Sequence, residues 1–127
     1  MNCEECNPTI LFAEDDKELM QMYTRALKDR HLNIETAGDG REALGKVTGK
    51  RYDIMLLDIM MPIKSGIEVI RELPEICIDT HIIILSNLAA TDVPVDIRSR
   101  ANRYIVKAET TPSKLADVIC EVAATFV

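Results

Sequence analysis

Residues that break regular structure are scarce in this sequence. The chain of 127 residues contains only five glycines and five prolines, a composition that favours a folded chain over a disordered one. Hydrophobic residues make up 47% of it, enough to form a buried core. A chain of this length fits one domain, so we expect a single folded unit.

Long apolar runs are also missing. No stretch of about 18 consecutive apolar residues occurs, so we expect no membrane-spanning helix. Residues 1–8 are polar and lack the apolar stretch of a signal peptide. These absences predict a cytoplasmic protein without a membrane partner.

Positive charge is in short supply. Lys and Arg number 15 against 21 Asp and Glu, which gives a formal net charge of −6. Nucleic acids and anionic lipids repel a negatively charged chain, so we expect no nucleic-acid partner here. The balance instead suits a protein that holds a cation or meets a basic partner.

Four cysteines are present, and they fall into two pairs of different character. Cys77 and Cys120 lie among apolar residues and are interpreted as small core residues. Cys3 and Cys6 form a CxxC pattern, which could be half of a zinc site or a redox pair. Zinc needs four ligands and no second such pattern exists, while a redox pair should follow a strand rather than precede the first one. We therefore interpret residues 1–8 as an N-terminal tail.

Short apolar runs alternate with amphipathic stretches along the chain. The runs predict strands at residues 9–13, 33–37, 54–57, 81–85 and 103–106. The other stretches predict five helices. The first three are expected over about 16–30, after the cap Asp39, and from Ser65 or Gly66 to before Pro74. The fourth should begin near Val93, and the fifth after the cap Thr111, with Pro112 at its first position. This alternation predicts an α/β fold, a parallel sheet with helices on both faces.

Charged or hydroxyl side chains follow four of the five predicted strands. They are Glu14, Asp15 and Asp16 after the first strand, Asp58 after the third, Ser86 after the fourth and Lys107 after the fifth. Ligands bind beyond the carboxyl ends of the strands in such sheets, so we expect these side chains to converge at one edge.

The expected cluster combines acids, a hydroxyl and an amine. Neighbouring carboxylates repel one another unless a cation intervenes, and Mg²⁺ prefers oxygen ligands. A carboxylate beside such a metal can attack a phosphoryl group, whose oxygens a lysine and a hydroxyl can then bind. The pattern therefore favours phosphoryl transfer to an aspartate.

Four segments of the chain form a recognisable set, namely ILFAEDD at 10–16, DIMLLDIMMP at 53–62, IIILS at 82–86 and YIVK at 104–107. Together they resemble the signature segments of response-regulator receiver domains. The resemblance covers about residues 8–125. It implies a flavodoxin-like, doubly wound, five-stranded parallel sheet of strand order 2-1-3-4-5 with five helices, a receiver domain at 9–127 that follows the tail at 1–8.

The resemblance also implies a metal site. Glu14 and Asp15 match the acidic pair that holds Mg²⁺ (or Mn²⁺), and Asp58 and the backbone carbonyl of Met60 would be further ligands. Asp16, the third acid, is interpreted as a helix-start residue favoured by the helix dipole rather than as a ligand.

The remaining matches concern the phosphoryl group. By resemblance Asp58 is the phospho-acceptor, Ser86 would donate a hydrogen bond to the phosphoryl group, and Lys107 would pair with it. Tyr104 matches the aromatic residue that changes rotamer when the hydroxyl residue moves, so Ser86 and Tyr104 would form the switch.

The function that the resemblance implies is a phosphoryl-accepting receiver in a two-component or phosphorelay system. The donor would be a phosphohistidine on a sensor histidine kinase or a histidine phosphotransfer protein, and a downstream protein would read the switched face. Such a chain, a monomer or weak homodimer, catalyses only its own phosphorylation and dephosphorylation and is not a conventional enzyme. A receiver-shaped adaptor that is never phosphorylated is one alternative. A haloacid-dehalogenase-like phosphatase is another, but that class needs an Asp where Met60 stands.

Three positions depart from the family pattern. Asn87 stands where a small residue usually follows the hydroxyl residue, and Ala108 stands where proline usually follows the lysine. Pro94 fits only the first turn of the fourth helix, which should therefore be short. A cis bond before a non-proline residue costs about 3 kcal/mol, so we predict a trans Lys107–Ala108 bond. Lys107 should still reach Asp58 through its flexible four-carbon stem.

Overall fold

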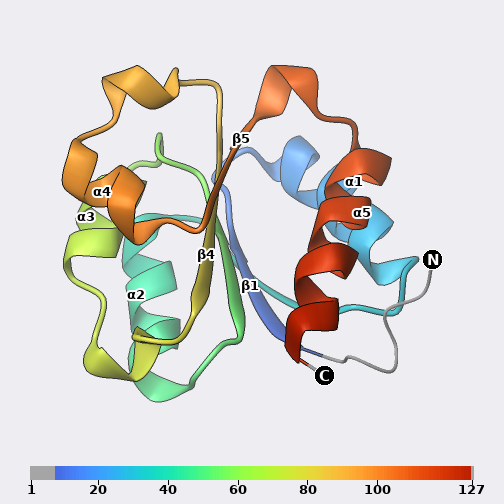
Figure 1. Cartoon of the computed structure of the whole chain (residues 1–127), viewed down its shortest axis with the longest axis horizontal. Coiled ribbons are helices and arrows are strands. Elements are labelled where there is room, and N and C mark those ends of the chain that lie inside the picture. Colours follow the sequence, from blue (N-terminus) through green and yellow to red (C-terminus); the bar gives the residue numbers. More distant parts are fainter. Residues whose placement is uncertain (1–7, 127) are drawn as a thin grey trace.

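The computed structural model describes residues 8–126 and has three layers, a central sheet between two layers of helices (Figure 1). The strands are β1 (Thr9–Ala13), β2 (Asn33–Ala37), β3 (Ile54–Leu57), β4 (His81–Ser86) and β5 (Arg103–Val106). All are parallel, in the order β2-β1-β3-β4-β5. The predicted strand order is confirmed. The CxxC pattern at Cys3 and Cys6 lies outside the described residues.

Five α-helices cover the two faces of the sheet. They are α1 (Lys17–Lys28), α2 (Gly40–Gly49), α3 (Gly66–Arg71), α4 (Val95–Arg100) and α5 (Pro112–Ala123). Short 3₁₀ turns are η1 (Glu75–Cys77), η2 (Ala90–Asp92), η3 (Lys107–Glu109) and η4 (Ala124–Phe126). Helices α1 and α5 lie on one face, and α2, α3 and α4 lie on the other (Figure 1). The doubly wound arrangement predicted from the sequence is therefore confirmed.

Alternate residues of the strands form two separate cores. Ile54 and Leu56 of β3 pack toward α1 and α5, with Tyr23 and Ile119 among their neighbours. The intervening strand residues pack toward α2, α3 and α4. Because both faces of a parallel sheet are covered, its central strands β1, β3 and β4 consist of nearly continuous apolar residues, the pattern from which they were predicted. Cys77 and Cys120 are buried on opposite faces.

Side-chain caps begin four of the helices at the predicted places. Asp16 accepts from the N–H groups of Glu18 and Leu19, and Asp39 and Thr111 accept from Glu42 and Lys114. Ser65 and Glu68 form a reciprocal capping box at the start of α3. These caps satisfy backbone donors that have no partner within the helix, which is why such residues mark helix starts.

Three element boundaries differ from those expected. Helix α4 begins at Val95 rather than near Val93, because Val93 precedes Pro94 and is held extended, with φ −102° and ψ 134°. Helix α1 ends at Lys28, since His31 adopts a left-handed φ of 62° just beyond it. Strand β4 extends one residue further than predicted, to Ser86.

Two further expectations concern the backbone and the membrane. No cis peptide bond occurs among the described residues, so the predicted trans Lys107–Ala108 bond is confirmed. Within residues 8–126, no helix is both long and apolar enough to span a bilayer.

Candidate functional site

The candidate site lies at the carboxyl-end edge of the sheet, where the backbone holds two acids in place. The N–H of Glu14 donates to the carbonyl of Ala37 at 3.0 Å, and the N–H of Asp58 donates to that of Ala13 at 3.1 Å. These bonds continue the pairing of β1 with β2 and β3 by one residue. The two acids are therefore fixed by the sheet rather than carried on free loops.

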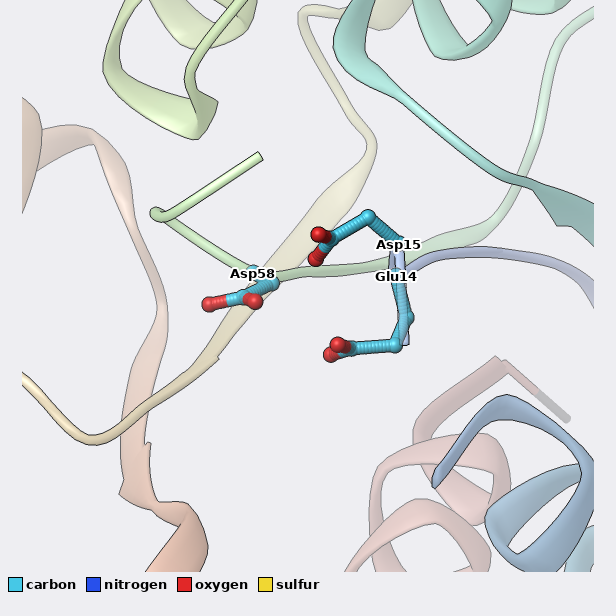
Figure 2. Close-up of side chains that lie close together, drawn as sticks. All are labelled: Glu14, Asp15 and Asp58. Carbon is cyan, nitrogen blue, oxygen red and sulfur yellow. The ribbon is translucent and has the colours of Figure 1, made fainter. Parts of the chain in front are cut away.

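Glu14, Asp15 and Asp58 form one carboxylate cluster. Each offers an oxygen, and these oxygens all lie within 4.8 Å of one another. Figure 2 shows the three carboxyl groups turned toward a common space. Glu14 and Asp58 are buried, with 2% and 4% of their surface exposed, whereas Asp15 is open to solvent. The cluster thus has a buried floor and one accessible acid.

Lys107 supplies a positive charge to the buried part of this cluster. Its Nζ lies 2.6 Å from Glu14 Oε2 and 2.9 Å from Asp58 Oδ2. Apart from that ion pair, Glu14 Oε2 accepts no hydrogen bond within the described part of the chain. Burial alone would lower the pKa of Lys107, but its bonds to the two carboxylates raise it above the ordinary value. Lys107 is therefore a charged bridge between β1 and β3.

The surroundings of Glu14 perturb its ionisation. Burial raises its pKa above the ordinary value, and the negative charge of Asp58 adds to this effect. The Lys107 ammonium and the N–H of Asp16, which donates to Glu14 Oε1 at 3.2 Å, act in the opposite direction. The carboxyl group of Asp16 itself is engaged at the start of α1, as the sequence predicted.

Ser86 and Tyr104 meet at one residue of the loop after β4. Ser86 is buried, and its Oγ accepts from the N–H of Leu88 at 3.3 Å. The Tyr104 hydroxyl donates to the carbonyl of Leu88 at 2.6 Å. A displacement of Leu88 would therefore change the hydrogen bonds of both side chains.

Met60 and Gly66 shape the loop that follows Asp58. The N–H of Met60 donates to Asp58 Oδ1 at 3.2 Å. Gly66 N–H donates to the carbonyl of Ile59 at 2.8 Å, and a Cβ at Gly66 would lie only 2.4 Å from the carbonyl oxygen of Asp58. Glycine is thus required where α3 approaches the backbone of Asp58. From the sequence, Gly66 could be predicted only as a helix start, because a glycine at that place gives no sign of what it will contact.

The donor set fits a hard divalent cation. All three acidic side chains offer oxygen, the ligand atom that Mg²⁺ and Mn²⁺ prefer. A buried carboxylate pair with a single ammonium, as formed by Glu14, Asp58 and Lys107, carries excess negative charge that a cation would neutralise. Bound there, the metal would supply charge neutralisation for an anionic group that approaches Asp58.

The chain matches a known family over most of its length. A model of the response regulator receiver domain matches residues 10–119. The transcriptional regulatory protein PrrA of Mycobacterium tuberculosis is 32% identical over 119 residues, which are 93% of this chain and 49% of that protein. The chain thus spans about half the length of the curated relatives that it matches.

Solved structures show the same fold. The receiver domain of Francisella response regulator 1452 aligns with a TM-score of 0.82 and 29% identity, covering 95% of this chain and 100% of that one. Response regulator protein TrrA from Thermotoga maritima, solved in complex with Mg(2+)-BeF, aligns with a TM-score of 0.79 and 29% identity, covering 91% and 98%.

Proposed function

The chain belongs to the response regulator receiver domain family, and we propose that it accepts a phosphoryl group on Asp58. The observation that carries the proposal is the placement of Asp58. It is buried at the carboxyl end of β3, contacts the Lys107 ammonium at 2.9 Å, and shares a cluster with two further acids. No other aspartate in the described residues combines these three features.

In the proposed reaction a carboxylate oxygen of Asp58 attacks the phosphorus of a phosphohistidine. The new O–P bond forms as the P–N bond breaks, and the imidazole nitrogen leaves with the electron pair of that bond. The Lys107 ammonium moves from a carboxylate oxygen to a phosphoryl oxygen. The Ser86 hydroxyl donates a hydrogen bond to a second phosphoryl oxygen. Hydrolysis of the acyl phosphate later restores Asp58.

The proposed cation is Mg²⁺, or Mn²⁺ in its place. Glu14, Asp15 and Asp58 would hold it through carboxylate oxygens, with the backbone carbonyl of Met60 as a further ligand. The oxygen cluster supports this assignment, as does the Mg(2+)-BeF complex of the related Thermotoga protein. Four ligands from the chain would leave positions of an octahedral ion for water and for the phosphoryl group.

The proposed switch uses the shared contact at Leu88. If Ser86 turns toward a phosphoryl group on Asp58, its hydroxyl leaves the N–H of Leu88, and the loop that also holds Tyr104 is released. A change of the Tyr104 rotamer would then alter the surface near β5. This route is two contacts long, so it needs no rearrangement of the core.

The partners follow from this chemistry. A sensor histidine kinase or a histidine phosphotransfer protein would donate the phosphoryl group, and a downstream protein would bind the switched face. We further propose a cytoplasmic protein, monomeric or weakly dimeric, with no activity beyond its own phosphorylation and dephosphorylation. PrrA, a transcriptional regulatory protein, is matched by this chain over 49% of its own length.

The alternatives make different demands on the site. A haloacid-dehalogenase-like phosphatase needs a second aspartate two residues after the nucleophile, and Met60 occupies that position. A receiver-shaped adaptor would not need the Lys107 ammonium against Asp58. The two buried carboxylates that this ammonium bridges favour the phosphorylated receiver over the adaptor.

The test is phosphorylation of the whole chain by acetyl phosphate with Mg²⁺, followed by intact-mass measurement. We expect one phosphoryl adduct on the wild type and none on Asp58→Asn. Asp79→Asn, which changes an exposed aspartate just before β4, is the matched control and should be labelled like the wild type. A labelled Asp58→Asn chain would refute the assignment of Asp58, and an unlabelled wild type would favour the adaptor.

A further inference from the structure

Asn87 forms a hydrogen bond to the backbone just beyond Lys107. It follows Ser86 at the end of β4, and its Oδ1 accepts from the N–H of Ala108 at 2.9 Å. Ser86 pairs with Val106 in the sheet, so the two segments leave β4 and β5 side by side. The bond therefore joins the segment that carries Ser86 to the segment that carries Lys107.

This bond completes the hydrogen bonding of one peptide unit. The carbonyl of Lys107 accepts from the N–H of Thr110 at 3.1 Å, and the N–H on the other side of the same peptide bond donates to Asn87. With both polar groups bonded, the plane of the Lys107–Ala108 peptide cannot rotate without breaking a contact. A proline after Lys107 would have no N–H to donate, so Ala108 makes the contact possible.

The orientation of this peptide matters for the amine of Lys107. In the present structure the far end of the side chain is fixed by Glu14 and Asp58. When a phosphoryl group reaches Asp58, the ammonium must leave a carboxylate oxygen for a phosphoryl oxygen. Its four-carbon stem is flexible, so the attachment at the backbone then limits where the ammonium can go.

We propose that Asn87 is a positioning residue for phosphoryl transfer, an inference that rests on the proposed function of Asp58. Asn87 touches no reacting atom. It fixes the peptide after Lys107 through Ala108, and thereby aims the ammonium at the phosphoryl oxygens. Removal of the bond should slow the transfer step while leaving the affinity for a small donor unchanged, because Asn87 is not among the residues proposed to hold the phosphoryl group or the cation.

The experiment compares Asn87→Ala with Asn87→Asp in the whole chain with Mg²⁺, over a range of acetyl phosphate concentrations. The net free energy of one hydrogen bond corresponds to a change in rate of a few-fold. The maximal phosphorylation rate of Asn87→Ala should therefore be about threefold below that of the wild type. The half-saturating donor concentration should not change. Asn87→Asp keeps an acceptor oxygen and should restore the maximal rate, even if its charge weakens donor binding at low salt.

A second readout, taken without metal or donor, tests the bond itself. Hydrogen exchange of the Ala108 amide, followed by NMR, should be faster in Asn87→Ala than in the wild type and in Asn87→Asp. Glu109→Gln is the matched control. It changes an exposed side chain in the same 3₁₀ turn and should alter neither the exchange nor the rate.

The outcomes separate the two proposals. Wild-type labelling with an unaffected maximal rate in Asn87→Ala would overturn the role of Asn87 and leave that of Asp58 intact. An equally slow Asn87→Asp would also overturn it, since the acceptor would then not be what matters. A wild type that takes no phosphoryl group would overturn both.

Discussion

At the scale of single residues, Ile63 is the most strained position described. Its φ of 69° lies in the left-handed region, and the N–H of Lys64 donates across it to the carbonyl of Pro62 at 2.7 Å. A β-branched side chain is unfavourable there, at a cost of about 1–2 kcal/mol. Ile63 is also 69% exposed, so little burial offsets the strain.

We therefore expect Ile63→Gly to stabilise the fold. Glycine relieves the strain but adds freedom to the unfolded chain, so the net gain in the free energy of unfolding should be about 1 kcal/mol. Urea denaturation measures it. Ile78→Gly is the matched control, since Ile78 is 76% exposed but has an ordinary φ of −58°, and it should destabilise instead. Equal losses in both variants would show that Ile63 carries no strain.

His81 is a second residue whose environment has a measurable consequence. It begins β4, and its Nε2 is buried without a hydrogen bond to any of the described residues. Burial, and then the positive charge of Arg103, hold the pKa of His81 below its ordinary value. As the pH falls through about 6.5, the unfolded chain takes up a proton before the folded one does. The stability that neutral His81 provides is thus present above this pH and is lost below it.

The test is the free energy of unfolding between pH 7.5 and pH 5 for the wild type and His81→Gln. We expect the wild type to lose more stability than the variant over the acidic part of this range, because glutamine does not titrate. His31→Gln, at an exposed residue, should follow the wild type. Parallel curves for the wild type and His81→Gln would contradict the burial argument.

Ile63 and Asn87 show which features of single residues the sequence does not reveal. The convergence of Glu14, Asp58 and Lys107 could be predicted, because parallel strands bring their carboxyl ends to one edge. The left-handed φ of Ile63 and the hydrogen bond that the Ala108 N–H donates to Asn87 could not be predicted. Both depend on how loops close between elements whose register, such as Ser86 with Val106, is fixed only in the folded sheet.

At the scale of elements, the predictable features were those with local causes. Apolar runs marked the strands, and caps such as Asp39 and Thr111 marked helix starts, since each cap satisfies donors of its own helix. Helix α4 was harder. Pro94 restricts the conformation of Val93, and this effect is local. The chain between β4 and α4 also forms η2, however, and the place of η2 depends on tertiary packing.

Helix α3 shows how an element can serve the site without carrying a reactive group. It has only six residues, too few to be stable alone, and it is held by the Ser65 and Glu68 capping box. Gly66 lets its first turn lie against the backbone of Asp58. The cap and the close approach together set the position of the loop that follows Asp58.

At the scale of the whole molecule, the Lys107 ammonium connects the ends of three strands. Lys107 follows β5 and bridges Glu14 after β1 and Asp58 after β3. All three side chains are at most 10% exposed, so these charges are poorly hydrated and depend on one another. The chain has a net charge of −6. Loss of the Lys107 ammonium would therefore remove a positive charge from a place where negative charge is already concentrated.

Lys107→Met should therefore destabilise the whole fold, by about 3 kcal/mol in metal-free buffer, because it leaves two buried carboxylates unpaired. Thermal and urea unfolding would measure the loss. Lys64→Met is the matched control. It breaks the salt bridge between Lys64 and Glu72, whose side chains are 31% and 47% exposed. Such an exposed pair contributes only about 0–1 kcal/mol to the free energy of unfolding.

Millimolar Mg²⁺ should recover more stability in Lys107→Met than in the wild type, because the added cation replaces the missing charge and no ammonium competes with it. Stability is measured in Ca²⁺-free buffer with and without Mg²⁺, at constant ionic strength. This comparison separates binding of Mg²⁺ from general screening of charges by salt. A loss no larger than that of Lys64→Met would mean that the ammonium does not hold the three strand ends together. A large loss that Mg²⁺ fails to reduce would mean that the carboxylates do not form a cation site once Lys107 is gone.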